Sequence, residues 1–295
     1  MGLDRDSALL ARALSGSGVE TLSPRLRNLG DLFSGKFRAD TAFHIERVAP
    51  WWKRKAGMHF LIPNQERFPE RLLPRLGMVD RVLCKSRHSE EIFSRHHADV
   101  RFIGFTSEDR GMPGAEPDYG RFFHLAGRST LKNTELLLEL WGKHPEWPLL
   151  TLVQHPENAP KVVPGNVELV ARYLDDDGLK LLQNTCGIHL CPSLSEGWGH
   201  YIVESMSCAA VTVTTAAPPM DELVTAERGI TVPVSHSEPR HLGTNFHADP
   251  VEMEAAVEHL IAMPEAEKRK LGLAGREWFL KNDHTFSSRL ATAIS

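Results

Sequence analysis

Two glutamates separated by seven residues are the most informative chemical feature of this 295-residue chain. Glu196 opens a glycine-rich turn over residues 196–199, and Glu204 lies in the helical pattern that follows. A carboxylate offers only hydrogen-bond acceptors, which suits hydroxyl groups. Backbone amides at the start of a helix attract anions such as phosphate. The combination favours a ligand that carries both hydroxyl and phosphate groups, as a sugar nucleotide does.

A second chemical feature lies upstream, where Gly127, Arg128 and Lys132 follow the apolar run 122–126. A guanidinium fork and an ammonium point charge beside a glycine turn suit a diphosphate. The alternative is a solvated helix entrance that Ser129 or Thr130 caps. We favour the phosphate interpretation, because the glycine turn is placed at the end of a predicted strand.

The two glutamates also raise the possibility of a glycosidase, in which paired carboxylates flank the scissile bond. Residues eight apart in one helical register would lie about 12 Å apart along the helix axis. Separate roles for Glu196 and Glu204 therefore fit better than an acid/base pair.

The elements around these residues predict parallel sheets with helices on their faces. Apolar runs alternate with helical patterns in both halves of the chain, which is typical of doubly wound α/β domains. Ligands of such sheets bind outside the carboxyl ends of the strands. Strands are expected at residues 42–48, 58–63, 81–84, 100–105, 122–126, 149–153, 167–171, 188–191, 211–214 and 230–234, with helices at 7–14, 89–96 and over most of 250–295.

Composition and charge limit the classes of partner. A net charge of -4 gives no global attraction to nucleic acid or to an acidic membrane. No apolar run is long enough to span a bilayer, and Asp4, Arg5 and Asp6 lie where a signal peptide would be apolar. A cytoplasmic protein is expected.

Cysteine and histidine spacing predicts no metal site. Cys84, Cys186, Cys191 and Cys208 match neither a zinc-ligand nor a redox spacing, so we expect most of them to be buried as small apolar side chains. Among the 15 histidines, His96 and His97 are adjacent on an apparent helix and cannot both face one ion.

The motifs resemble, in order, those of retaining glycosyltransferases with the GT-B architecture, the family 4-like glycosyl transferases of group 1. The resemblance rests on the pair Glu196 and Glu204, on the turn at 122–133, and on segments 218–224 and 229–233. It implies an α/β fold with two Rossmann-like domains that face each other across a cleft. The implied parts are an acceptor-side domain (1–110), a Gly- and Pro-rich linker (111–120), a nucleotide-sugar-binding domain (121–275) and a last helix (276–295) that crosses back to the first domain.

One departure concerns the beginning of the first domain. The family begins with a strand and a glycine-bearing loop, whereas residues 2–10 already resemble the helix that follows that loop. The expected first domain is therefore shortened, or the sequence begins late. Residues that the family supplies from that loop have no counterpart here.

The resemblance implies transfer of a sugar from a nucleotide-diphosphate donor, with retention of configuration and without a metal or a further cofactor. In the family, the cations bind the diphosphate, the first glutamate binds the donor sugar, and the second binds the ribose. The implied catalytic residues are Glu196, Arg128, Lys132 and His44. The implied donor-binding residues are Gly127, Arg128, Lys132, Glu196, Gly197, Trp198, Gly199, His200 and Glu204.

Several alternatives stay open from the sequence. The same scaffold would suit a sugar-nucleotide epimerase, a glycan phosphorylase or a noncatalytic glycosyltransferase-like partner protein. The acceptor is a glycan, a lipid-linked sugar, a protein or a small molecule. Residues 51–55 combine two tryptophans with three cations and could stack an acceptor sugar, touch the inner membrane surface or contact nucleic acid. They could equally be half-buried tryptophans beside solvated cations.

Overall fold

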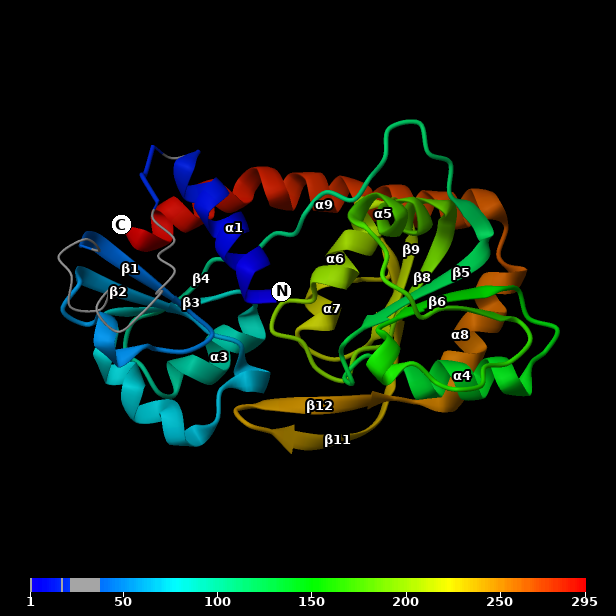
Figure 1. The fold of residues 1–295 in the computed structure, drawn as a ribbon, viewed down its shortest axis with the longest axis horizontal. Helices are drawn as coiled ribbons and strands as arrows, with labels where there is room; N and C mark the ends of the chain where they lie inside the picture. Colours follow the sequence, from blue (N-terminus) through cyan, green and yellow to red (C-terminus); the bar gives the residue numbers. More distant parts are fainter. Residues whose placement is uncertain (1, 17, 22–37) are drawn as a thin grey trace. The chain divides into compact units, whose positions relative to one another are not determined.

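The computed structural model describes residues 2–16, 18–21 and 38–295, which fall into two units (Figure 1). Unit 1 takes its residues from Met1–Thr106, Pro239–Thr244 and Asn282–Ser295. Unit 2 comprises Ser107–Glu238 and Asn245–Lys281. Each unit is built on its own parallel sheet, which confirms the predicted α/β class.

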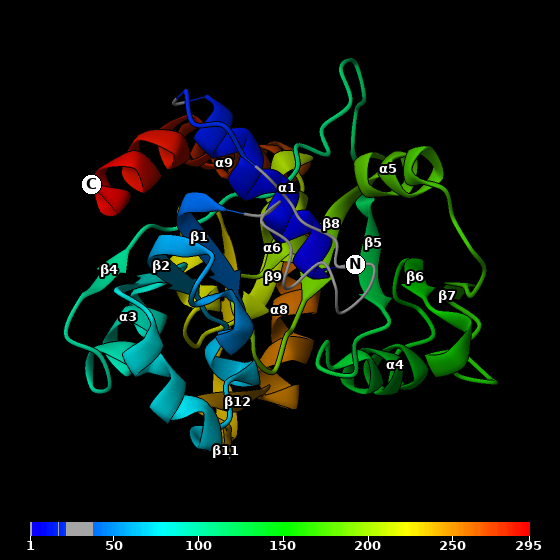
Figure 2. The ribbon, with the colours of Figure 1, turned by 60° about the vertical axis from the view of Figure 1, so that its left-hand side comes forward.

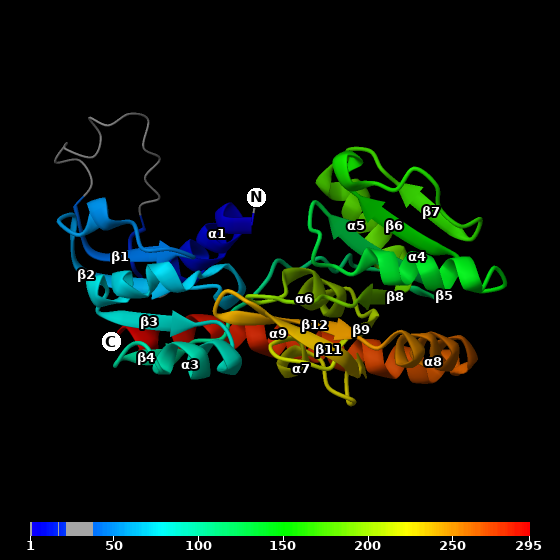
Figure 3. The same cartoon turned by 90° about the horizontal axis from the view of Figure 1, so that it is seen from below.

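Unit 1 contains a four-stranded sheet in the order β1-β2-β3-β4. Its core packs Phe68 edge-on against Phe93, with Leu61 and Val82 of the central strands beside them. Helix α3 begins after Ser86, whose side chain caps the Ser89 amide, and lies beside β3 and β4 (Figure 3). The elements are α1 (Gly2–Ser15), β1 (Ala39–Ile45), η1 (Pro50–Trp52), β2 (Ala56–Ile62), η2 (Gln65–Arg67), η3 (Glu70–Met78), β3 (Arg81–Cys84), α3 (Arg87–Ser94) and β4 (Val100–Phe102).

Unit 2 contains a six-stranded parallel sheet in the order β10-β9-β8-β5-β6-β7. Every residue of its central strand β8 is buried, because helices cover both faces of the sheet. The elements are β5 (Asp118–Gly127), α4 (Thr134–Lys143), β6 (Leu150–Gln154), η4 (Pro156–Asn158), β7 (Val167–Val170), α5 (Asp176–Thr185), β8 (Cys186–Cys191), α6 (His200–Ser207), β9 (Val211–Thr215), α7 (Met220–Leu223), β10 (Gly229–Val232) and α8 (Pro250–Ala262).

The two faces of this sheet have separate cores. On one face, Leu137 and Trp141 of α4 and Val257 of α8 pack over the strands. On the other face, α5 covers Phe123 and Cys186. Figure 2 shows α4 and α5 on opposite sides of strands β5 and β6. The sheet is thus the middle layer of unit 2, and its strand ends stay available for a site.

Two further elements contribute residues to both units. Strands β11 (Val234–Arg240) and β12 (Gly243–Ala248) form a two-stranded sheet, and the residues between them belong to unit 1. There the Leu242 amide donates to the Phe68 carbonyl at 3.3 Å. The last helix, α9 (Glu265–Ile294), supplies residues to unit 2 and then to unit 1.

The predicted strands are all present, with four differences in detail. Strand β1 spans Ala39–Ile45 and not 42–48, so residues 46–48 are irregular. Strand β4 ends at Phe102, so residues 103–105 are irregular. Strand β5 begins at Asp118, inside the segment expected as a linker, because Tyr119 is buried in the core of unit 2. The hairpin of β11 and β12 was not predicted, since β11 is exposed and carries no apolar alternation. The expectation that most cysteines are buried is confirmed, since all four are.

Candidate active site

The strand order of unit 2 creates one position where neighbouring connections run in opposite directions. From β5 the chain moves outward through β6 to β7, and it then returns to β8, which pairs with the other side of β5. The loops after β5 and β8 therefore separate at this point. In open α/β sheets, this switch point at the carboxyl ends of the strands is where ligands bind.

These two loops carry the residues that the sequence motifs single out. The β5 loop leads to α4 through Arg128 and Lys132, and the β8 loop leads to α6 through Glu196. The Leu194 amide donates to the Leu131 carbonyl at 2.9 Å, which ties the loops together. A backbone link of this kind fixes their side chains relative to each other.

Gly199 sets the point at which the β8 loop becomes helix α6. It has φ 98°, a conformation that side chains rarely adopt. A Cβ atom there would lie 3.1 Å from both Ile202 and Leu223. Helix α6 thus begins at His200, and Glu196 lies before it. Glu196 thus lies in the turn, where the sequence placed it, and the 12 Å helical spacing does not apply to the two glutamates.

Lys132 and Glu196 form the centre of the candidate site. The Lys132 ammonium makes an ion pair with Oε1 of Glu196, and each side chain is 14% exposed. Oγ of Ser193 lies 3.4 Å from Lys132 Nζ and donates to the same Glu196 oxygen. The ammonium also lies 3.4 Å from the centroid of the Tyr201 ring. The structure therefore brings together one predicted cation and one predicted carboxylate.

Arg128 takes a different direction from Lys132. Its side chain is exposed, and Nη2 lies 2.8 Å from Nε2 of His155. The side-chain Nδ2 of Asn158 donates to the Arg128 carbonyl at 2.9 Å. In the described part of the chain, the hydrogen bonds of Arg128 thus go to His155 and to Asn158 of η4, and none goes to Glu196. Its role toward phosphate stays a prediction.

Glu204 lies on α6 and is only 2% exposed. Its backbone carbonyl accepts hydrogen bonds from Oγ of Ser207 and the amide of Cys208, as expected within a helix end. The burial distinguishes Glu204 from Glu196, which reaches the partly open cluster. Recognition of a ribose by Glu204 stays a prediction.

The remaining motif residues surround the start of α6. Gly197, Trp198 and Gly199 are buried, and the Trp198 indole donates to Oγ of Ser107 at 3.3 Å. The same oxygen lies 2.9 Å from Nδ1 of His200. Within unit 2, Trp198 and His200 are thus linked through one hydroxyl, an arrangement that the sequence did not indicate.

His44, expected as a catalytic residue, lies in unit 1 with both ring nitrogens engaged. The Lys53 carbonyl can only accept, so His59 donates to it from Nε2 at 3.2 Å and accepts at Nδ1 from Nε2 of His44, at 3.1 Å. The Ala49 amide donates to Nδ1 of His44 at 3.4 Å. Burial and the charge of His59 lower the pKa of His44 to about 4. A neutral, saturated imidazole favours a structural role.

Residues 51–55 keep all three of their binding interpretations. Trp51 is 57% exposed, and the side chains of Lys53 and Arg54 are exposed as well. Exposed aromatic and cationic groups suit a sugar, an anionic lipid surface or a nucleic-acid backbone equally. No helix of the described residues is both long and apolar enough to cross a membrane.

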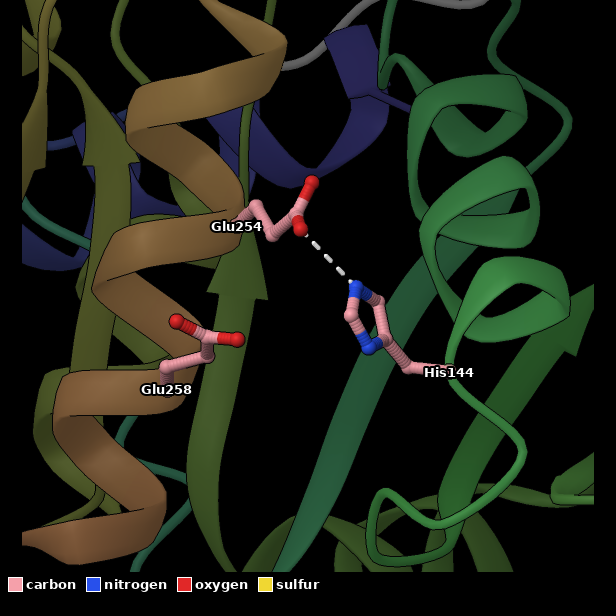
Figure 4. A group of neighbouring side chains, drawn as sticks. All are labelled: His144, Glu254 and Glu258. Carbon is pink, nitrogen blue, oxygen red and sulfur yellow. Dashed lines mark hydrogen bonds and ion pairs between the residues drawn. The ribbon is translucent and has the colours of Figure 1, made fainter.

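One group of described side chains, His144, Glu254 and Glu258, has the spacing of a metal site (Figure 4). Its contacts are those of an ion-pair network. The Lys143 ammonium contacts both oxygens of Glu254, and the two ring nitrogens of His144 lie 2.9 Å from Glu146 and Glu254. Hydrogen bonds to these carboxylates raise the pKa of His144. The network links the end of α4 to α8, and we assign it no metal.

A hollow of about 340 Å³ opens in unit 1, between β4 and the end of α9. The Arg289 guanidinium that lines it already donates to the Ile103 carbonyl and to Thr285. The hollow shares no residue with the Lys132 cluster, and we assign it no ligand.

Comparisons with known proteins match part of unit 2 to a known family. The profile of the family described as glycosyl transferases group 1 matches residues 163–271, a range that contains Glu196 and Glu204. A search of the curated proteins gave no match to the sequence.

Solved structures show the same fold at low sequence identity. Sucrose-phosphate synthase from Thermosynechococcus elongatus is 17% identical, with a TM-score of 0.68 over 89% of this chain and 75% of that one. HepE from Anabaena, in complex with UDP and glucose, is 15% identical, with a TM-score of 0.63 over 80% and 71%. The pneumococcal O-GlcNAc transferase GtfA, in complex with UDP and GlcNAc, is 10% identical, with a TM-score of 0.65 over 90% of this chain and 58% of its own.

The match to the family profile and the likeness to these folds confirm the resemblance seen in the motifs. The chain thus carries a glycosyl transferases group 1 domain in residues 163–271 and has the fold of GT-B glycosyltransferases.

Proposed function

We propose that this protein transfers a sugar from a uridine-diphosphate donor, which it binds at the switch point of the unit 2 sheet. The observation that carries the proposal is the Lys132–Glu196 pair, a cation and a carboxylate brought together at the carboxyl ends of β5 and β8. A donor that carries both phosphate and hydroxyl groups suits this combination. Uridine is proposed because HepE and GtfA were each crystallised with UDP.

Lys132 supplies positive charge for the diphosphate. At an effective dielectric of about 20, one ammonium at about 4 Å from a unit negative charge gains about 4 kcal/mol before desolvation is subtracted. The interaction grows as the bond between the sugar and the diphosphate breaks, because the leaving group gains charge. Arg128 adds a second cation once its side chain turns from His155.

Glu196 and the start of α6 bind the sugar side of the donor. The carboxylate accepts hydrogen bonds from sugar hydroxyls, and the amides of Gly197 and Gly199 add donors near the amino end of an eight-residue helix. Glu204 is proposed to anchor the ribose. The acceptor is bound elsewhere in the chain, and its class is left to experiment.

The cell compartment proposed is the cytoplasm. All four cysteines are free thiols buried in the protein, which suits a reducing environment. Contact with the inner surface of a membrane is a further possibility that the exposed Trp51 and its neighbouring cations raise.

Titration calorimetry with UDP, GDP and ADP tests the donor site. We expect the wild type to bind UDP and Lys132→Ala to bind it at least tenfold more weakly. Lys143→Ala is the matched control, because it removes a lysine that pairs with a glutamate of the same unit, Glu254. Equal UDP affinity in wild type and Lys132→Ala would contradict the assignment.

Product analysis separates the proposal from its competitors. A UDP-sugar donor incubated with a panel of acceptors should yield free UDP and a glycosylated product of retained configuration. An epimerised sugar nucleotide or a sugar phosphate would indicate another enzyme on the same scaffold. If the donor binds tightly but is neither transferred to any acceptor nor hydrolysed by water, the protein is a noncatalytic partner protein.

A further inference from the structure

Tyr201 closes a ring of side chains around Lys132, and the sequence motifs assign it no role. It lies in the first turn of α6 and is 7% exposed. The face of its ring is 3.4 Å from Lys132 Nζ, measured to the centroid. Its hydroxyl lies 2.6 Å from Oγ of Ser193. One side chain thus touches the phosphate-binding cation directly and reaches toward the glutamate.

The hydrogen bonds in this ring have a defined direction. Ser193 gives its only proton to Oε1 of Glu196, so it accepts from Tyr201 and from Lys132. Burial raises the pKa of Tyr201 well above its usual value, so the phenol keeps its proton and stays a donor. The chain of donors therefore runs from Tyr201 through Ser193 to Glu196.

A lysine needs such support more than other cations do. Its ammonium is a point charge at the end of a flexible stem, and fixing that stem costs rotamer entropy. An aromatic face attracts the ammonium most where water is partly excluded, as it is around Lys132. Groups that are already placed before the ligand arrives give a larger share of their interaction energy to binding and to the transition state.

We propose that Tyr201 is a positioning residue for the donor. Its ring holds the Lys132 ammonium where the diphosphate binds, and its hydroxyl orients Glu196 toward the sugar through Ser193. This inference rests on the proposed function of the same site. A tyrosine that only filled the core would need neither the contact with a cation nor the directed hydrogen bond.

Three variants test the two halves of the role. Tyr201→Leu removes the ring and the hydroxyl, Tyr201→Phe keeps the ring, and Ser193→Ala breaks the link to Glu196. Tyr119→Phe is the matched control, because Tyr119 is a buried tyrosine of the same unit whose hydroxyl donates to the Ala209 carbonyl at 3.0 Å.

The binding probe is whichever of UDP, GDP or ADP the wild type binds most tightly, together with its nucleoside. We expect Tyr201→Leu to weaken diphosphate binding about tenfold. Nucleoside binding, followed by ligand-observed NMR, should change less than about twofold, because the nucleoside has no phosphate for Lys132. Damage to the core would weaken both ligands together.

A turnover assay tests the role of the Tyr201 hydroxyl. Its substrate is the sugar nucleotide that contains the best-bound diphosphate, and release of that diphosphate is measured. We expect Tyr201→Phe and Ser193→Ala to lower kcat about tenfold with KM within about threefold of wild type, because Glu196 loses its orienting bond. Tyr119→Phe should change neither value.

The outcomes separate this inference from the proposed function. Unchanged diphosphate affinity in Tyr201→Leu, or an equal loss for diphosphate and nucleoside, would overturn the role of the ring. If Tyr201→Leu does not fold, unchanged kcat in both other variants overturns the whole inference. If the wild type binds none of the three diphosphates, the proposed donor site itself falls and the inference with it.

Discussion

Replacing Glu196 with glutamine should strengthen UDP binding while it slows turnover. The substitution keeps the shape of the side chain and removes one of the two charges of the Lys132 pair. In the wild type, Lys132 is neutralised by Glu196, and both side chains are only 14% exposed, so solvent screens the pair incompletely. An arriving diphosphate meets a cation that is already paired and a carboxylate that repels it.

The size of the effect follows from the positions of these charges. With Lys132 between them, a phosphate and the Glu196 carboxylate would lie on the order of 7 Å apart, a repulsion of about 2.4 kcal/mol per unit charge at a dielectric of about 20. Solvent around the partly open pair reduces this figure. A net gain of about 1.4 kcal/mol, which is tenfold in Kd, is the expected result.

Turnover should change in the opposite direction. A hydrogen bond from a sugar hydroxyl to a carboxylate is about twice as strong as one to an amide oxygen. The weaker hydrogen bond to the sugar in the transition state should lower kcat roughly tenfold to a hundredfold. We therefore expect Glu196→Gln to release UDP from a donor sugar slowly although it binds UDP well.

Calorimetry with UDP and a donor-turnover assay on the same preparation measure both effects. Glu254→Gln is the control, because Glu254 also pairs with a lysine of unit 2. Weaker UDP binding by Glu196→Gln would refute the electrostatic reasoning. An equal change in the control would show that the effect is not specific to this pair.

The remaining predictions concern charge and pH. Arg128→Ala should weaken UDP binding by less than Lys132→Ala, because the Arg128 side chain is exposed and bound to a histidine; calorimetry on both variants checks the order. The pKa of His44 is lowered to about 4, as it is for two further buried histidines. The unfolded chain thus binds more protons between about pH 6.5 and 4, and the free energy of unfolding should fall with decreasing pH, by at most about 1.4 kcal/mol per unit for each histidine; denaturant titrations at several pH values measure the slope. Hydrogen bonds to two carboxylates raise the pKa of His144, so its stabilising effect is present below pH 6.5 and is lost as the pH rises through the raised value. NMR titration should place that pKa above 6.5 and show it decreasing in Glu254→Gln.

Apolar runs predicted the strands of both sheets, with the clearest signal where a strand is buried on both faces. Residues 188–191 form part of β8, in which every residue is buried, and a continuous apolar run is what such a strand requires. Strand β11 offered no such signal, since its side chains are mostly exposed. The nine-residue 3-10 helix η3 was missed as well, because Pro74 interrupts its pattern.

Only those parts of the candidate site that lie in local sequence motifs could be predicted. Lys132 and Glu196 were expected in one site, since strand-end loops of a parallel sheet meet at one edge, and they form an ion pair. The contributions of Ser193 and Tyr201 depend on how the β8 loop folds back onto the β5 loop, which spacing does not reveal. Likewise, the engagement of His44 by His59 follows from β1 and β2 lying side by side.

A crystal structure of the protein with UDP tests the central claim most directly. We expect the diphosphate at the carboxyl ends of β5 and β8, with a phosphate oxygen within hydrogen-bond distance of Lys132 Nζ. UDP bound at another place, with Lys132 still paired to Glu196 and no phosphate beside it, would contradict the account.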